Sequence, residues 1–129
     1  MDAPFRATYQ TKRMWYERML CAEHRGAYVG YVRGEFSRTL TGFFQEVSSA
    51  FRFPYTFSWS WESLDACFRD LEWLSFSQLL WVISQPEKLF TQEENHMAHV
   101  NALQRSIAAA ASFWRERQIP FDCVLNLFE

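Results

Sequence analysis

Residues 51–61 read FRFPYTFSWSW, and an aromatic side chain occupies every second position of this stretch. Periodicity alone favours a half-buried β-strand with one aromatic face. Pro54 argues against a strand, because proline removes a hydrogen-bond donor from the middle of the ladder. The residues from Ser60 onward then change to helical spacing without a turn residue between. We therefore expect an irregular, aromatic-lined loop that leads into a helix.

Helices are predicted on both sides of this loop. The first covers residues 41–51, from apolar residues that recur at three and four positions: Phe43, Phe44, Val47, Ala50 and Phe51. Pro54 closes it, because the residue before a proline is disfavoured in helical conformation. The second begins at Ser60, a good N-cap, with Glu62 in its first turn. Its apolar side consists of Trp61, Leu64, Cys67, Phe68 and Leu71, and its opposite side of Glu62, Asp65, Ala66, Arg69 and Trp73.

Three strands and a long helix complete the predicted order. Residues 27–32 and 121–128 read as strands, and residues 79–83 form a continuous apolar run, typical of a parallel strand covered on both faces. The residues from Thr91 to Glu94 resemble a capping box, which predicts a long helix that starts there and ends before Pro120. Residues 14–21 are compatible with helix or strand. This order predicts a small α/β layer architecture with right-handed crossovers.

The bulk composition predicts one globular domain over residues 1–129. Apolar residues make up 49% of the chain and aromatic residues 19%, and no apolar run approaches the roughly 20 residues that span a bilayer. The N-terminus lacks the apolar region of a signal peptide. The three cysteines show no CxxC spacing, and we expect Cys67 and Cys123 to be buried in the core. A cytoplasmic protein is the expectation.

Charge is distributed unevenly along the chain. Residues 1–52 carry eight basic and five acidic residues, a net of +3, whereas residues 53–129 carry five basic and ten acidic residues, a net of −5. An acidic middle segment favours contact with a basic partner. The alternative is an ordinary solvated acidic face.

The residues that could carry catalysis are few. No glycine-rich phosphate loop is present, and His96 and His99 have no obvious third and fourth ligand, so neither a metal nor a cofactor is predicted. The acids of the second helix, among them Glu62 and Asp65, lie along one exposed helix instead of converging on a cleft. Direct nucleic-acid binding is disfavoured, because Arg52 is the only base in the aromatic run. We therefore do not expect an enzyme.

A protein-recognition surface accounts best for these features. Tyr55, Phe57 and Trp59 are candidate aromatic anchors beside a helix that presents Glu62 and Asp65. Trp73 is a further candidate anchor, with packing under a loop as the alternative. For each of the other aromatics, the alternative is burial in the core.

The segment from Arg33 through the second helix resembles the barstar family, small intracellular inhibitors of barnase-type ribonucleases. The family's helix motif, Trp-Asp-Ala-Leu-x-Asp-Cys-Leu-x-Asp-Leu, is matched by Trp61, Glu62, Leu64, Cys67, Asp70 and Leu71. The resemblance covers about three quarters of the chain, including the strand at 79–83 and the terminal strand. Residues 1–25 form an extension that it does not explain.

The resemblance implies a three-stranded parallel sheet packed by helices. It also implies that the loop at 54–60 and the helix that follows enter the active site of a ribonuclease, where carboxylates stand in for RNA phosphates. Several positions depart from the family pattern: its second helix acid falls on Ala66, its loop tyrosine on Thr56, its loop glycine on Ser58 and its last-helix acid on Arg115. These changes predict weak inhibition of barnase itself.

The sequence thus predicts an inhibitor, or immunity protein, that occludes a basic ribonuclease or nuclease toxin domain and needs no cofactor. A bacterial toxin–antitoxin pair is the implied setting. The alternative is an interaction module of the same fold with a non-nuclease partner. The candidate partner-binding residues are Tyr55, Thr56, Phe57, Trp59, Glu62, Asp65, Ala66, Arg69 and Trp73.

Overall fold

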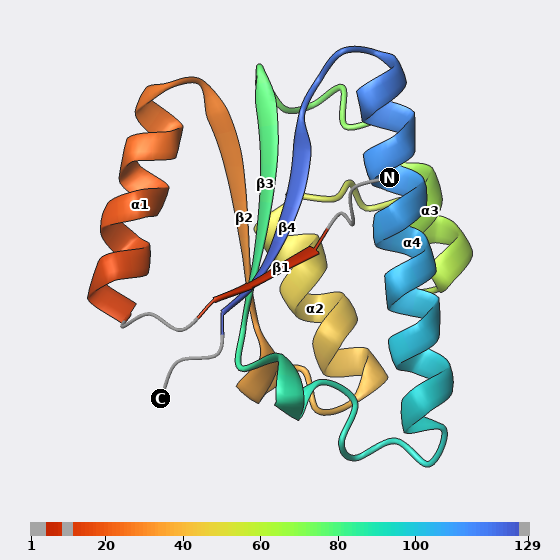
Figure 1. The fold of residues 1–129 in the computed structure, drawn as a ribbon. Coiled ribbons are helices and arrows are strands. Elements are labelled where there is room, and N and C mark those ends of the chain that lie inside the picture. Colours follow the sequence, from red (N-terminus) through yellow and green to blue (C-terminus); the bar gives the residue numbers. More distant parts are fainter. Residues whose placement is uncertain (1–4, 9–11, 127–129) are drawn as a thin grey trace.

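The computed structural model describes residues 5–8 and 12–126, which fold into one α/β unit (Figure 1). The strands are β1 (Phe5–Thr8), β2 (Ala27–Arg33), β3 (Gln78–Ser84) and β4 (Phe121–Asn126). The α-helices are α1 (Lys12–His24), α2 (Leu40–Ala50), α3 (Trp61–Phe68) and α4 (His96–Glu116), and the short 3₁₀ turns are η1 (Gly34–Phe36) and η2 (Pro86–Lys88). The predicted strands at 27–32 and 79–83 and the predicted helix at 41–51 are each confirmed within a residue or two. Residues 127 and 128 of the predicted last strand lie outside the described part of the chain.

The sheet is parallel throughout, in the order β1-β4-β3-β2. Its three strands β2, β3 and β4 are the predicted parallel sheet, in a register that pairs Trp81 with Gly30 on one side and with Cys123 on the other. The N-terminal segment adds β1 as a fourth strand at the β4 edge. The predicted α/β fold class is confirmed, and the extension enlarges its sheet.

Helices cover both faces of the sheet. Figure 1 shows α2, α3 and α4 on one face and α1 on the other. The larger core lies under α2, α3 and α4, and its biggest side chains, among them Trp81, Phe43 and Phe68, are fully buried. A smaller cluster beneath α1 contains Ala22, Leu80 and Val124. The residues from Leu79 to Ser84 are all buried, as the continuous apolar run predicted.

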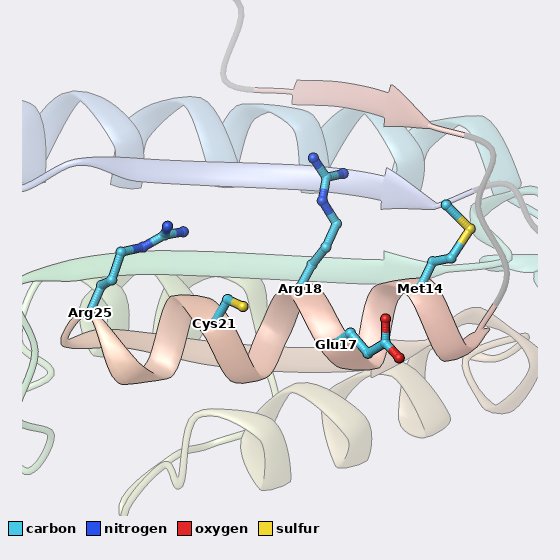
Figure 2. A pocket seen from close by; sticks show the side chains of 5 residues that line it. All are labelled: Met14, Glu17, Arg18, Cys21 and Arg25. Atoms are coloured by element: carbon cyan, nitrogen blue, oxygen red, sulfur yellow. The ribbon is translucent and has the colours of Figure 1, made fainter.

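Residues 14–21, which the sequence left open between helix and strand, belong to α1. This helix borders a cavity of about 630 Å³ lined by Met14, Glu17, Arg18, Cys21 and Arg25. Figure 2 shows Arg18 and Arg25 extending from the same side of α1. The extension therefore contributes a strand to the β4 edge of the sheet, and a helix with its cavity to the face opposite α3.

Two predicted helix boundaries were wrong. The helix α3 ends at Phe68, and Leu71, predicted as its last apolar residue, has a positive φ of 50° in the turn that follows. The capping box at Thr91 does not form, since α4 begins at His96. The carboxylate of Glu93 instead accepts a hydrogen bond from the backbone N–H of Leu40, at 2.8 Å. Glu93 thereby satisfies one of the backbone N–H groups that the first turn of α2 leaves without a partner inside the helix.

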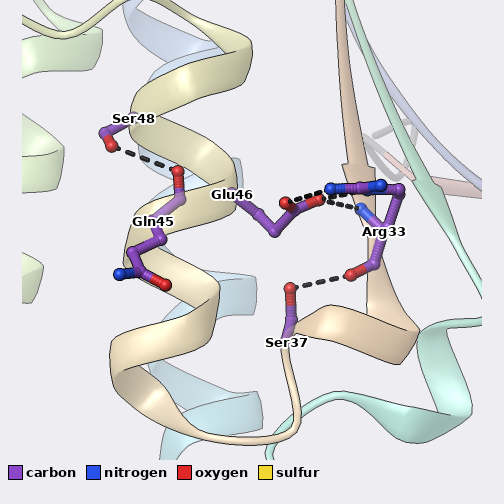
Figure 3. Close-up of polar contacts among 5 residues, drawn as sticks. All are labelled: Arg33, Ser37, Gln45, Glu46 and Ser48. Carbon is purple, nitrogen blue, oxygen red and sulfur yellow. Dashed lines mark hydrogen bonds and ion pairs between the residues drawn. The ribbon is translucent and has the colours of Figure 1, made fainter.

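A bidentate ion pair joins β2 to α2. Two nitrogens of the Arg33 guanidinium, Nε and Nη2, donate to the Glu46 carboxylate at 3.0 and 2.9 Å (Figure 3). The backbone N–H of Arg33 donates to the same carboxylate at 3.0 Å. These hydrogen bonds favour the ionised carboxylate, so they hold the pKa of Glu46 below its ordinary value. Only 15% of the Glu46 side chain is exposed, compared with 49% of Arg33.

The Arg33–Glu46 pair predicts a pH-dependent contribution to stability. Because the folded-state pKa of Glu46 is lowered, the pair stabilises the protein above the ordinary value of 4.5, and this contribution is lost as the pH falls through the lowered value. Replacing Glu46 by glutamine should cost about 1 kcal/mol at pH 7, since the half-exposed Arg33 guanidinium is screened by solvent. Urea unfolding between pH 3 and 7 should show this cost shrinking toward acid. If the cost of the substitution grew as the pH fell, the lowered pKa of Glu46 in the folded state would be contradicted.

Candidate functional site

The segment between α2 and α3 is an irregular loop, as predicted from Pro54, and it is tied down at several points. Phe53 N–H donates to Ser48 O at 2.9 Å, and Phe57 N–H donates to Pro54 O at 3.0 Å. Positive φ angles at Arg52 (54°) and Trp59 (59°) break the extended conformation that a strand would need. The loop is therefore held in one shape before any partner binds.

The alternating aromatics of this loop divide between the core and the surface. Phe51 is fully buried, and Phe57 is only 6% exposed and packs edge-on against Phe44 at 5.7 Å between ring centroids. Tyr55, by contrast, is 98% exposed and Trp59 is 46% exposed. Phe57, predicted as a surface anchor, thus lies in the core, where its ring supports the loop from beneath. Tyr55 and Trp59 are the two aromatic side chains of the loop that reach the surface.

Trp73 also differs from its predicted placement. It lies in the turn after α3, not on a polar face of that helix, and it is partly buried. Its indole N–H donates to Phe51 O at 2.9 Å, and its ring meets Phe53 edge-on at 6.3 Å. Packing beneath the loop, the alternative considered for this residue, is what the structure contains.

The helix α3 begins as the sequence predicted. Ser60 is its N-cap, and its Oγ accepts a hydrogen bond from Ser63 N–H at 3.1 Å. The hydroxyl of Ser63 in turn accepts from Ser58 N–H at 3.0 Å, so two serines join the loop to the helix. Glu62 is exposed in the first turn, where the helix dipole favours a negative charge.

Asp65 and Glu62 differ in their exposure to solvent. Asp65 lies one turn after Trp61 on the same side of α3, and the Trp61 indole N–H meets His99 Nδ1 of α4 at 3.4 Å. Asp65 is partly buried, and its Oδ1 is buried without a hydrogen-bond partner. The first-turn acid Glu62 is exposed to solvent. Both carboxylates belong to α3, so they do not face each other across a cleft between two elements.

A cavity of about 190 Å³ lies between the loop and α3. Two candidate residues at which the chain departs from the family pattern, Thr56 and Ala66, line it together with Trp73. The remaining lining residues are Pro54, Ser63, Cys67 and Asp70. Arg69 is exposed at the end of α3 and is not among them.

The predicted partner-binding residues did not include Pro54, Ser63, Cys67 and Asp70, which also line this cavity. A usable signal was present, since Ser63, Ala66, Cys67 and Asp70 follow the three- and four-residue spacing of one helix face. The meeting of that face with Pro54 and Thr56 had no local signal, because it depends on how the loop folds back.

The buried thiols are unsuited to nucleophilic chemistry. Cys67 and Cys123 are buried, as predicted. Burial raises the pKa of both thiols, and the nearby Asp70 carboxylate raises that of Cys67 further. A raised pKa lowers the fraction of reactive thiolate. Among the described residues, no group of three or more His, Cys, Asp and Glu side chains is arranged to hold a metal ion.

A second cavity, of about 340 Å³, lies between the ends of β3 and β4 and α4. Its lining is apolar apart from Gln104, and includes Ile83, Leu103 and Leu125. Enzymes built on parallel sheets commonly place polar side chains at the carboxyl ends of the strands. The described lining residues here offer no such group of acids and bases.

Comparison with known proteins gives one family match. The model of a family described as "Barstar (barnase inhibitor)" matches residues 27–126. A search of curated proteins finds no match. The matched segment starts at the first residue of β2 and ends at the last residue of β4, so β1 and α1 lie outside it.

In the described part of the chain, no helix has the length and apolar character needed to cross a membrane.

Proposed function

The chain belongs to the barstar family, and from this premise we propose that it is an inhibitor of a cognate ribonuclease or nuclease toxin domain. It binds the enzyme and covers the active site, in the cytoplasm of the cell that must be protected. The chain itself performs no catalysis and binds no nucleic acid in this role. A partner with a basic active site fits the acidic character of residues 53–129, which carry a net charge of −5.

One observation carries the proposal: the loop with two exposed aromatics, Tyr55 and Trp59, leads directly into the helix whose first turn carries the exposed Glu62. A side chain as large as tyrosine gains substantial free energy when a partner buries it. A carboxylate in the first helical turn meets basic catalytic side chains as a phosphate would. Because hydrogen bonds within the chain already order the loop, little conformational entropy is lost on binding.

The other candidate residues have supporting roles in this proposal. Phe57 and Trp73 hold the loop from below, while Thr56 and Ala66 border the cavity between loop and helix. Asp65 adds negative charge beside α4, and Arg69 lies at the exposed rim, where it contributes to the choice of partner.

A second candidate function is an interaction module whose partner is not a nuclease. The positions Thr56, Ala66 and Arg115 favour it, because there the chain lacks the stacking tyrosine and two acids of the family pattern. Under this alternative the fold is kept and the surface has been adapted to another protein.

The test is isolation of the tagged protein from its host at low salt, identification of its partner, and assay of that partner for RNA cleavage. We expect a basic nuclease whose activity falls to background at one equivalent of this chain. A partner that binds stoichiometrically and has no nuclease activity would refute the inhibitor and support the interaction module. The neighbouring gene, expected to encode a nuclease or toxin, offers an independent check.

A further inference from the structure

We propose that the cavity between the loop and α3 is a socket that receives one arginine or lysine side chain of the partner protein. The proposal rests on the proposed function and makes it more specific: at Ala66, a side chain of the partner inserts into the inhibitor. Ala66 is exposed and carries only a methyl group, so the space beside it is open. The cavity holds about 190 Å³, several times the roughly 30 Å³ that a water molecule takes in the liquid.

The apolar lining of the socket suits the stem of a long basic side chain. Pro54 and Trp73 line the cavity, and the Trp73 indole is fixed by its hydrogen bond to Phe51 O at 2.9 Å. Alkyl stems of lysine and arginine pack on such surfaces. The face of an indole also attracts a cation more strongly than other aromatic rings do.

The polar lining provides an acceptor for the charged end. Asp70 lines the cavity, and its Oδ1 is oriented by the backbone N–H of Glu72 at 3.4 Å. The influence of this carboxylate on the pKa of Cys67, another lining residue, places its negative charge close to the cavity. No ion pair to Asp70 occurs among the described residues. The Thr56 hydroxyl is a further acceptor at the same cavity.

The charges around the socket also select a cation. Residues 54–73 carry four acids, Glu62, Asp65, Asp70 and Glu72, against the single base Arg69. An anionic side chain would be repelled by this field, and a neutral one would leave the carboxylate of Asp70 without a charged partner. Arginine is favoured over lysine, because its planar guanidinium can bind the carboxylate through two hydrogen bonds while its face packs on the indole.

The test uses a small probe that carries the arginine side chain, N-acetyl-arginine amide, and its neutral analogue N-acetyl-citrulline amide. Both are titrated into the full-length protein while amide and indole N–H signals are followed by NMR. We expect saturable shifts from the arginine probe, centred on the Trp73 indole and on the amides of Ser63, Ala66 and Asp70. The citrulline probe should produce none.

Three variants sharpen the result. Asp70→Asn should weaken binding of the arginine probe about tenfold, as expected when a charge-assisted hydrogen bond is lost. Glu72→Gln removes the same charge two residues away, outside the cavity, and should leave affinity within about twofold of the wild type. Ala66→Leu keeps a good helix former and should abolish the shifts by filling the socket.

Three results would each refute the proposed socket. They are equal shifts from the two probes, an absence of shifts near Trp73, and equal affinity of the wild type and Asp70→Asn for the arginine probe. The measurement involves no nuclease, so its failure would leave the inhibition assay unaffected. Conversely, a partner without nuclease activity would refute the proposed function and leave a positive probe titration intact.

Discussion

Replacing Phe51 by alanine is expected to lower the free energy of unfolding by about 3–5 kcal/mol. The ring is fully buried between α3 and the sheet, with centroid distances of 4.9 Å to Phe68 and 5.5 Å to Trp81. It also lies directly on the backbone of β2, since a Cβ added to Gly30 would come within 2.3 Å of it. Neighbours held by a sheet cannot collapse fully into the space left behind, so a cavity remains.

Urea unfolding, followed by tryptophan fluorescence and by circular dichroism, measures this loss. Tyr55→Ala is the matched control, because it removes an aromatic ring from the same loop at a position that is 98% exposed. We expect the control to change the unfolding free energy by less than about 0.5 kcal/mol. Similar losses in the two variants would mean that the loop does not divide its aromatics between core and surface as described.

Replacing Glu62 by arginine is expected to weaken binding to the cognate nuclease by about tenfold or more. The substitution puts a positive charge where the proposed interface presents a carboxylate to basic catalytic groups. Long-range attraction falls as well, so the association rate should drop and its dependence on salt should become shallower. Surface plasmon resonance at several salt concentrations measures both quantities.

The control for this variant is Glu87→Arg, which makes the same charge change at an exposed residue of η2. The turn η2 packs against η1, at the carboxyl ends of β2 and β3. The loop instead lies near the start of β2, where the Tyr28 hydroxyl donates to Ala50 O at 2.6 Å. We expect near wild-type affinity for Glu87→Arg. An unchanged affinity and salt dependence in Glu62→Arg would refute the role of Glu62 as a phosphate mimic.

Most of the secondary structure could be predicted because its signals are local. The apolar run at 79–83 identified a strand covered on both faces, and Ser60 marked the start of α3 through a cap that forms as expected. Pro54 was enough to reject a strand for the aromatic run. The four-residue strand β1 was not predicted, since a strand so short is defined by its pairing with β4, more than 100 positions along the chain.

The capping box at Thr91 shows where local signals fail. Its sequence is favourable, with Glu94 three residues after Thr91, but these residues form turns, and the neighbouring Glu93 carboxylate binds the N-terminus of α2. The helix instead begins at His96, with Asn95 at the N-cap position. Local propensity is a weak guide when a tertiary hydrogen bond of this kind is available.

What the sequence determined by itself was the order of the elements, the parallel α/β class, the irregular loop and the acidic helix that follows it. Which aromatics reach the surface was decided only by the tertiary structure. A turn closed by the hydrogen bond from Phe57 N–H to Pro54 O, at 3.0 Å, lies between the two positions, so that Phe57 enters the core and Tyr55 leaves it, although both share one face of the alternating pattern. Likewise, the folding of the loop onto α3 creates the cavity beside Ala66. Periodicity specifies a face only where the backbone is regular; in this loop the side-chain directions follow from contacts with distant residues.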